Sequence, residues 1–229
     1  MPSNTDLTPR LAFITALEGR QPPGRVPTFE LVFYLTMELL GKVHPTHRVF
    51  RQWDQMSPSE QRRQVADAAE VYIATARLYG HGAIFVHGCA GMPESELRIA
   101  ECIRERTGLE FFLCQHGDAT LSVPDGDQMM ALACRLADEP DRVKDEQARA
   151  VDRALAYAAQ HAAGGILDGF ALCADYCFNT NPFLSPPRFA EFVTPYLARL
   201  IAGYRELGYY TIKHTDGNIM PIIDQLVAC

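Results

Sequence analysis

Apolar residues recur at helical spacing along most of the chain and form short continuous runs between these stretches. Apolar positions every three to four residues predict amphipathic helices, and short apolar runs bounded by glycine predict buried strands. Helices are expected over residues 8–20, 31–40, 57–79, 93–107, 127–162, 185–208 and 219–227. Strands are expected over residues 25–30, 83–86, 109–114, 166–172 and 209–214. Pro140 is expected to interrupt the 127–162 helix, because proline cannot donate the helical hydrogen bond.

Continuous apolar strands that alternate with helices indicate a parallel sheet covered on both faces, either doubly wound or closed into a barrel. A complete barrel has eight strands and typically about 250 residues. About five strands are expected here, and the sequence stops at Cys229 within an expected helix. We therefore predict one α/β domain over residues 1–229 that is incomplete at its C-terminal end.

Composition limits the partners that the chain is expected to have. The 229 residues carry a formal net charge of −7, which disfavours a general affinity for nucleic acid or anionic membranes. A small-molecule partner fits this charge better. The first six residues lack the basic and apolar regions of a signal peptide, so we expect a cytoplasmic protein whose seven cysteines are thiols.

Polar residues follow the last four expected strands, where parallel-strand folds carry their reactive groups. These segments are His87-Gly88-Cys89, His116-Gly117-Asp118, Asp175-Tyr176-Cys177 and His214-Thr215-Asp216-Gly217-Asn218. Each contains a pair of side chains two residues apart, a spacing that places both on one face of an extended chain. A barrel mouth formed by these segments would bring several potential ligands together.

Each of these pairs has a functional and a structural interpretation. His214 and Asp216 are the strongest candidates for metal ligands, since imidazole and carboxylate both bind zinc. Asp216 or Asn218 can instead cap the helix that follows. For His87 with Cys89 and His116 with Asp118, packing and turn chemistry are the favoured alternatives.

Three further parts of the chain carry groups with both a functional and a structural interpretation. Asp168 lies within an apolar strand, where a carboxylate acts either as a general acid or base or as a structural partner of an arginine or a backbone amide. Asp175 and Tyr176 lie closer to the mouth and are the better candidates for catalysis. The His44-Pro45-Thr46-His47 segment is expected to be a surface turn, because Pro45 disrupts the helix that ligation by both histidines would need.

Three segments together resemble the uroporphyrinogen decarboxylase superfamily. The central one is Asp175-Tyr176-Cys177-Phe178-Asn179-Thr180-Asn181-Pro182-Phe183-Leu184-Ser185-Pro186, followed by Phe189, Glu191-Phe192 and Pro195-Tyr196-Leu197. The others are His214-Thr215-Asp216-Gly217-Asn218 and the opening Ala16-Leu17-Glu18-Gly19-Arg20 with Arg25-Val26-Pro27. The resemblance covers nearly the whole chain. It implies an eight-stranded (β/α) TIM barrel with a site at its C-terminal mouth, and a full-length protein longer than 229 residues.

The superfamily includes two well-known chemistries. True uroporphyrinogen decarboxylases need no cofactor and use an arginine-rich N-terminal segment and an aspartate at the end of the second strand. Here residues 26–34 contain no arginine, and His87-Gly88 occupy the position of that aspartate. Clustered arginines would hold the substrate's carboxylates, so this reaction lacks its usual residues.

The corrinoid-dependent methyltransferases of the superfamily carry a His-x-Cys-Gly-Asn motif whose histidine and cysteine bind zinc. His214, Gly217 and Asn218 match this motif, and Asp216 replaces the cysteine. An oxygen ligand can still hold zinc. The family's third ligand comes from a later strand, which is expected to lie outside this chain.

The leading hypothesis from the sequence is a metal-assisted methyltransferase that acts with a corrinoid carried by a partner protein, on a small molecule. His214 and Asp216 would bind zinc, and Asn218, His87 and His116 would contact the substrate. Asp175, Tyr176 and Asp168 are the expected catalytic residues. The alternatives are a cofactor-free decarboxylase acting on a porphyrinogen or another carboxylate, and a barrel that only binds a ligand.

Overall fold

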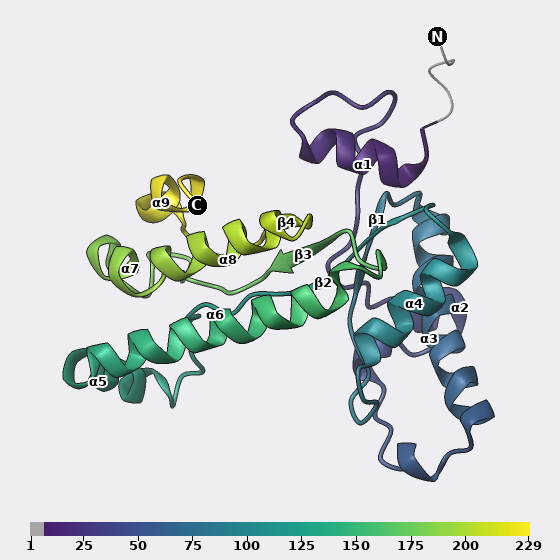
Figure 1. The fold of residues 1–229 in the computed structure, drawn as a ribbon, viewed down its shortest axis with the longest axis horizontal. Coiled ribbons are helices and arrows are strands. Elements are labelled where there is room, and N and C mark those ends of the chain that lie inside the picture. The colour runs from purple at the N-terminus through teal and green to yellow at the C-terminus, as the bar shows by residue number, and fades with distance from the viewer. Residues whose placement is uncertain (1–6) are drawn as a thin grey trace. The chain divides into compact units, whose positions relative to one another are not determined.

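The computed structural model of the chain describes residues 7–229 and has an α/β fold (Figure 1). The strands found among these residues are β1 (Ala83–Val86), β2 (Phe112–His116), β3 (Gly169–Leu172) and β4 (Tyr210–Lys213). The α-helices are α1 (Pro9–Leu17), α2 (Thr36–Leu40), α3 (Pro58–Tyr79), α4 (Ser95–Thr107), α5 (Met129–Asp138), α6 (Pro140–Ala162), α7 (Pro186–Phe192), α8 (Thr194–Glu206) and α9 (Ile223–Val227). Short 3-10 helices are η1 (Pro45–His47), η2 (Trp53–Gln55) and η3 (Met220–Ile222). No helix in the described part of the chain is both long enough and apolar enough to cross a membrane.

The chain divides into two compact units. The first extends to His116 and also contains Ile166–Asp168. The second contains Gly117–Gly165 and Gly169–Cys229. Each unit therefore holds one pair of strands, β1 with β2 in the first and β3 with β4 in the second.

The first unit is built around the parallel pair β1 and β2, in which Ala83 lies opposite Phe112. All of β1 is buried, as its apolar sequence predicts. Helices α3 and α4 pack against each other and against β1. Helix α3 begins with a capping box: the Ser57 hydroxyl accepts the Glu60 N–H, and the Glu60 carboxylate accepts the Ser57 N–H. The predicted start of this helix is confirmed.

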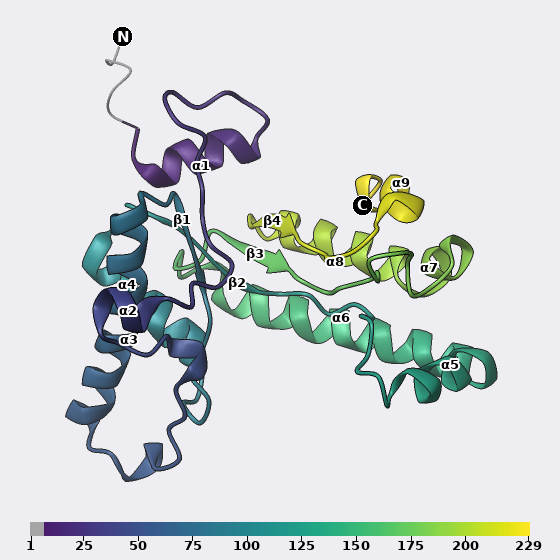
Figure 2. The same cartoon turned by 180° about the vertical axis from the view of Figure 1, so that it is seen from behind.

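The second unit places β3 and β4 in parallel register, with Leu172 opposite Lys213. The Phe170 ring stacks on Tyr204 of α8, with ring centroids 4.3 Å apart. Helices α6 and α8 lie side by side in both views (Figures 1 and 2). Because side chains alternate along a strand, Leu172 and Lys213 share the face that Phe170 presents to α8, and His214 points to the opposite face.

Proline explains where two long expected helices are divided. The 127–162 stretch is interrupted as predicted, because α5 ends at Asp138 and α6 begins at Pro140. The 185–208 stretch also consists of two helices, which the sequence did not predict. Val193 leaves helical geometry at φ −123° and ψ −54°, and Pro195, in the first turn of α8, has no N–H to bond to the preceding turn.

Two N-terminal predictions are wrong. Residues 25–30 form no strand, and Pro27 near the middle of this segment cannot donate a ladder hydrogen bond. The expected buried helix over residues 31–40 is limited to α2, and Leu35, Met37 and Leu39 on and beside it are exposed. An apolar run without an N-terminal capping residue gave no signal for where the helix begins, since Leu35 at the cap position has no side-chain acceptor.

The expected surface turn at His44–His47 is only half correct. His47 is exposed, but the His44 side chain is buried and packs edge-on against Tyr72 of α3, with ring centroids 5.3 Å apart. Its Nδ1 accepts the Thr46 N–H at the start of η1. His44 therefore belongs to the core of the first unit.

Candidate functional site

His214 and Asp216 form the chemically most distinctive pair at the carboxyl end of β4. The His214 N–H bonds to the Leu172 carbonyl at 2.9 Å, so the extended pairing with β3 continues one residue past β4. His214 Nε2 lies 3.5 Å from Asp216 Oδ1. The two side chains are 39% and 78% exposed, so a ligand can reach both from solvent.

The spacing of this pair suits two ligands of one metal ion. Donors bound at about 2.0–2.2 Å to one tetrahedral zinc lie roughly 3.4 Å apart. His214 Nδ1 is buried and has no hydrogen-bond partner among the described residues, so these residues do not supply the acceptor that usually orients a zinc-bound histidine. The fit of His214 and Asp216 as two ligands rests on the 3.5 Å spacing. Within residues 7–229 no group of three His, Cys, Asp or Glu side chains is arranged to hold a metal ion.

Asp175 lies in the loop after β3 and contacts the same pair through the backbone. Its Oδ1 accepts the Asp216 N–H at 2.9 Å. The Asp175 side chain is half-buried, and this bond links positions 41 residues apart in the sequence. The expected proximity of Asp175 to the β4 loop is therefore found in the structure.

Lys213 and Asp118 form a buried ion pair behind the strand ends of the second unit. Lys213 Nζ donates to Asp118 Oδ2 at 3.0 Å and to the carbonyls of Leu172 and Ala174 at 3.0 and 2.9 Å. The two side chains are 18% and 2% exposed. Burial alone would raise the pKa of Asp118, but Lys213, the Thr120 hydroxyl and two backbone amides together lower it. Asp118 is therefore an ionised structural group. Lys213 uses its three N–H donors within the protein, so none is left for a substrate.

Tyr176 is less accessible than a catalytic residue at a mouth would be. The residue is 3% exposed, and its hydroxyl lies 2.6 Å from the Thr120 hydroxyl. Its ring contacts Phe189 of α7 and lies 4.2 Å from Lys213 Nζ. Burial and the Asp118 charge raise the pKa of the phenol. The geometry thus favours a packing role for Tyr176.

Asp168 is a structural partner of two arginines, which is one of the two roles considered for it from the sequence. It lies one residue before β3, at the N-terminal end of that strand, and is buried. Oδ1 accepts two hydrogen bonds from Arg10, at 2.9 and 2.6 Å. Oδ2 accepts one from Arg104 at 2.9 Å and one from the Leu113 N–H at 2.8 Å. Both oxygens are therefore occupied by the protein itself.

The three expected substrate-binding residues have different surroundings. His87 Nε2 lies 2.8 Å from the Leu31 carbonyl, and its ring packs against Phe85, which favours the packing interpretation. His116 is the exposed last residue of β2. Asn218 donates from Nδ2 to the Thr180 carbonyl and accepts the Met220 N–H, so it shapes the loop after β4.

Sequence reasoning missed the residues that hold these groups in place. Arg10 and Arg104 lie far from Asp168 in the sequence, and no spacing links them. Lys213 did give a signal, since it lies near the end of an expected buried strand, where a lysine needs an anionic partner. Asp118 was considered as a potential ligand, with packing and turn chemistry favoured, and its pairing with Lys213 was not predicted.

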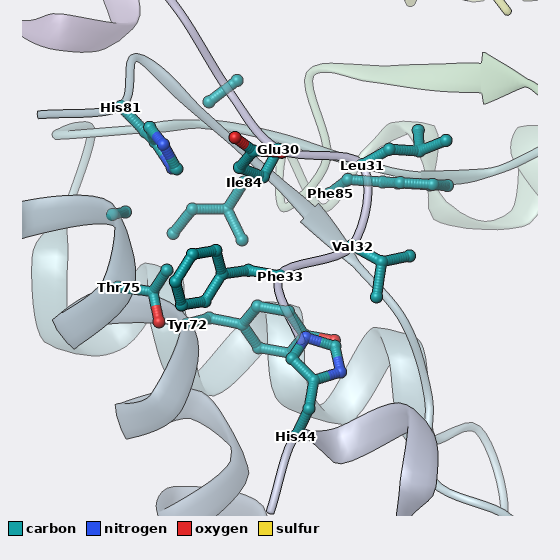
Figure 3. Close-up of a pocket in the computed structure, with 12 residues that line it drawn as sticks. Glu30, Leu31, Val32, Phe33, His44, Tyr72, Thr75, His81, Ile84 and Phe85 are labelled. Atoms are coloured by element: carbon teal, nitrogen blue, oxygen red, sulfur yellow. The ribbon is translucent and has the colours of Figure 1, made fainter. Parts of the chain in front are cut away.

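A small cavity in the first unit is lined by the 30–33 segment, α3 and β1 (Figure 3). Its volume is about 20 Å³, which suits one water molecule and no substrate. Thr75 lines it, and its hydroxyl has no hydrogen-bond partner among the described residues. Burial, assisted by His87, His47 and Arg48, lowers the pKa of His44, which also lines the cavity, to about 4. This cavity is therefore part of the core and not a candidate active site.

Comparisons with known proteins gave one informative result. No family model matches the sequence, and no curated protein matches it. Among solved structures, the fold is similar to that of a methyltransferase from Methanosarcina mazei, with a TM-score of 0.68 and 16% sequence identity. The alignment covers 98% of this chain and 74% of that one. At this identity the likeness shows a shared fold.

Proposed function

We propose that this protein is a methyltransferase-type enzyme built on a uroporphyrinogen decarboxylase-like (β/α) barrel. The observation that carries the proposal is the pair of His214 Nε2 and Asp216 Oδ1, 3.5 Å apart at the carboxyl end of β4. This pair occupies the histidine and cysteine positions of the methyltransferase motif. The fold likeness to a methyltransferase supports the same reaction class.

The residues of the site would have separate roles. His214 and Asp216 would hold a zinc ion, and Asp175 and Asn218 would hold the loop that carries them. When bound, the metal would act as a Lewis acid on the nucleophile or the leaving group. The methyl group would pass between a corrinoid held by a partner protein and a small-molecule acceptor.

Decarboxylation is the weaker proposal for this chain. It would place Asp168, Asp175 and Tyr176 against a carboxylate substrate. Asp168 binds two arginines, and the Tyr176 hydroxyl is buried against Thr120. Only Asp175 would then be left at the mouth, which is too little to hold a polycarboxylate.

Elemental analysis after dialysis against a mild chelator tests the proposal. In a full-length form that also supplies the third ligand, we expect about one zinc per chain, and strongly reduced zinc in His214→Ala and Asp216→Ala, since each would leave a single protein ligand from the pair. His161→Ala, which changes a histidine at the end of α6 in the same unit, is the matched control and should keep its zinc. Incubation with a methylcobalamin donor and a set of small thiols then tests methyl transfer through the corrinoid absorbance.

Two results would overturn the proposal. Zinc that is equally low in the parent and all variants would return His214 and Asp216 to structural roles. Conversion of uroporphyrinogen to coproporphyrinogen would establish the decarboxylase reaction instead.

A further inference from the structure

The loops after β3 and β4 are joined by a reciprocal pair of hydrogen bonds. The Asp216 N–H donates to Asp175 Oδ1 at 2.9 Å. In return, the Tyr176 N–H donates to Thr215 Oγ1 at 3.1 Å. Each loop thus supplies one acceptor side chain and one backbone donor, so the two bonds together hold the loops in register.

Residues 217 and 218 continue this contact between the loops. Gly217 has φ +87°, and a Cβ atom there would lie 2.6 Å from the carbonyl oxygens of Cys177 and Phe178. The Asn218 N–H donates to the Phe178 carbonyl at 2.8 Å. A side chain at 217 would therefore push the two loops apart, and glycine is required for their close approach.

We propose that Asp175 is a positioning residue for the metal-binding pair. Its carboxylate fixes the Asp216 backbone, and this places the Asp216 carboxylate 3.5 Å from His214 Nε2. The inference rests on the proposed function, because it assigns that spacing to metal binding. It changes the role predicted for Asp175 from the sequence, where it was expected to act in catalysis.

A positioning role makes a distinctive demand on residue 175. The Asp216 N–H needs an oxygen acceptor there but no negative charge. Asparagine supplies such an oxygen and alanine does not. A general acid or base, or a direct metal ligand, would instead require the carboxylate itself.

Cobalt(II) titration, followed by visible absorbance, distinguishes these roles in the same full-length form that supplies the third ligand. Loss of residues that orient metal ligands costs about 10–100-fold in affinity. We expect Asp175→Ala to weaken cobalt binding by about tenfold or more, and Asp175→Asn to stay within about threefold of the parent. Thr215→Val and Thr215→Ser test the reciprocal bond, because serine keeps the hydroxyl that accepts the Tyr176 N–H and valine does not. Thr215→Val should weaken cobalt binding more than Thr215→Ser. Equal losses in Asp175→Asn and Asp175→Ala, or no loss in Asp175→Ala, would overturn the inference.

Amide hydrogen exchange at Asp216 provides a readout that does not depend on metal. The Asp216 amide should be protected from exchange in the parent and in Asp175→Asn. In Asp175→Ala it should exchange faster by about tenfold or more, because the side-chain oxygen that accepts its N–H is missing. If the parent binds no cobalt, the proposed function fails, and this exchange pattern still decides whether Asp175 holds the Asp216 backbone. Unchanged exchange in Asp175→Ala would show that it does not.

Discussion

His44 is a buried titratable residue surrounded by other basic groups. It is 4% exposed, and its ring centroid lies 6.2 Å from that of His87 and 6.5 Å from that of His47. Arg48 adds a fixed positive charge nearby, although this guanidinium is also paired with Asp67. A proton on His44 would lose hydration and meet like charges. These causes lower its pKa from 6.5 to about 4.

This shift predicts how stability depends on pH. The pKa of His44 is lower in the folded than in the unfolded chain, so acid favours unfolding. The contribution of neutral His44 is fully present above pH 6.5, is lost as pH falls from 6.5 to about 4, and levels off below that, a change of about 3 kcal/mol. Urea unfolding at several pH values should show a steeper acid loss in the parent than in His44→Asn, which can still accept the Thr46 N–H. Parallel profiles for the two proteins would contradict this account.

At the scale of elements, Lys213 connects three segments of the second unit. It joins the end of β4 to Asp118, which follows β2, and to two carbonyls at the end of β3. Lys213→Met would leave the Asp118 carboxylate buried without its cation. Breaking a buried pair in this way costs about 3–5 kcal/mol, measurable as a lower free energy of unfolding in urea at neutral pH.

The matching double variant tests whether the ion pair is the cause. Asp118→Asn together with Lys213→Met removes both charges, so part of the loss from Lys213→Met alone should be recovered. The loss in the single variant should also shrink as the pH falls and Asp118 takes up a proton. A single-variant loss below about 1 kcal/mol would mean that the pair contributes little.

The elements that the sequence predicted well carry local signals, and the others depend on distant contacts. The start of α3 follows from Ser57 and Glu60, and the division at Pro140 follows from proline chemistry. The expected strand over 109–114 is displaced to Phe112–His116, because pairing with β1 carries it through the polar Gln115 opposite Val86. Because Gln115 is polar, the sequence predicted that the strand would end before it. Gln115 is nevertheless buried, because it pairs with Val86 of β1.

The same distinction applies to the candidate site. The His214–Asp216 spacing follows from a local pattern, so the sequence could predict it. The carboxylates of Asp118, Asp168 and Asp175 all lie near strands, and their sequence positions do not separate them. Their partners do: a lysine, two arginines and a backbone amide, each at least 41 residues away.

At the scale of the whole molecule, the chain passes between the two units three times. The first unit includes Ile166–Asp168, a segment that follows α5 and α6 in the sequence. Within this unit, Asp168 binds Arg10 and Arg104, whose side chains are 20% and 11% exposed. The Asp168 N–H also donates to the Leu113 carbonyl at 2.8 Å. The first unit is therefore not a contiguous segment that a single cut would release.

This discontinuity predicts that residues 1–116 will not fold alone. Without Asp168 the fragment has two largely buried guanidinium groups without their anion, and each lost partner costs several kcal/mol out of a typical total of about 5–15 kcal/mol. We expect the fragment to show poorly dispersed amide resonances and no cooperative urea transition. Asp168→Ala in the full chain isolates the contribution of the carboxylate, and should lower the free energy of unfolding by about 3–5 kcal/mol. A well-dispersed spectrum from residues 1–116 would mean that the core around β1, α3 and α4 is stable without the two arginine pairs. That result would contradict the structural role assigned to Asp168.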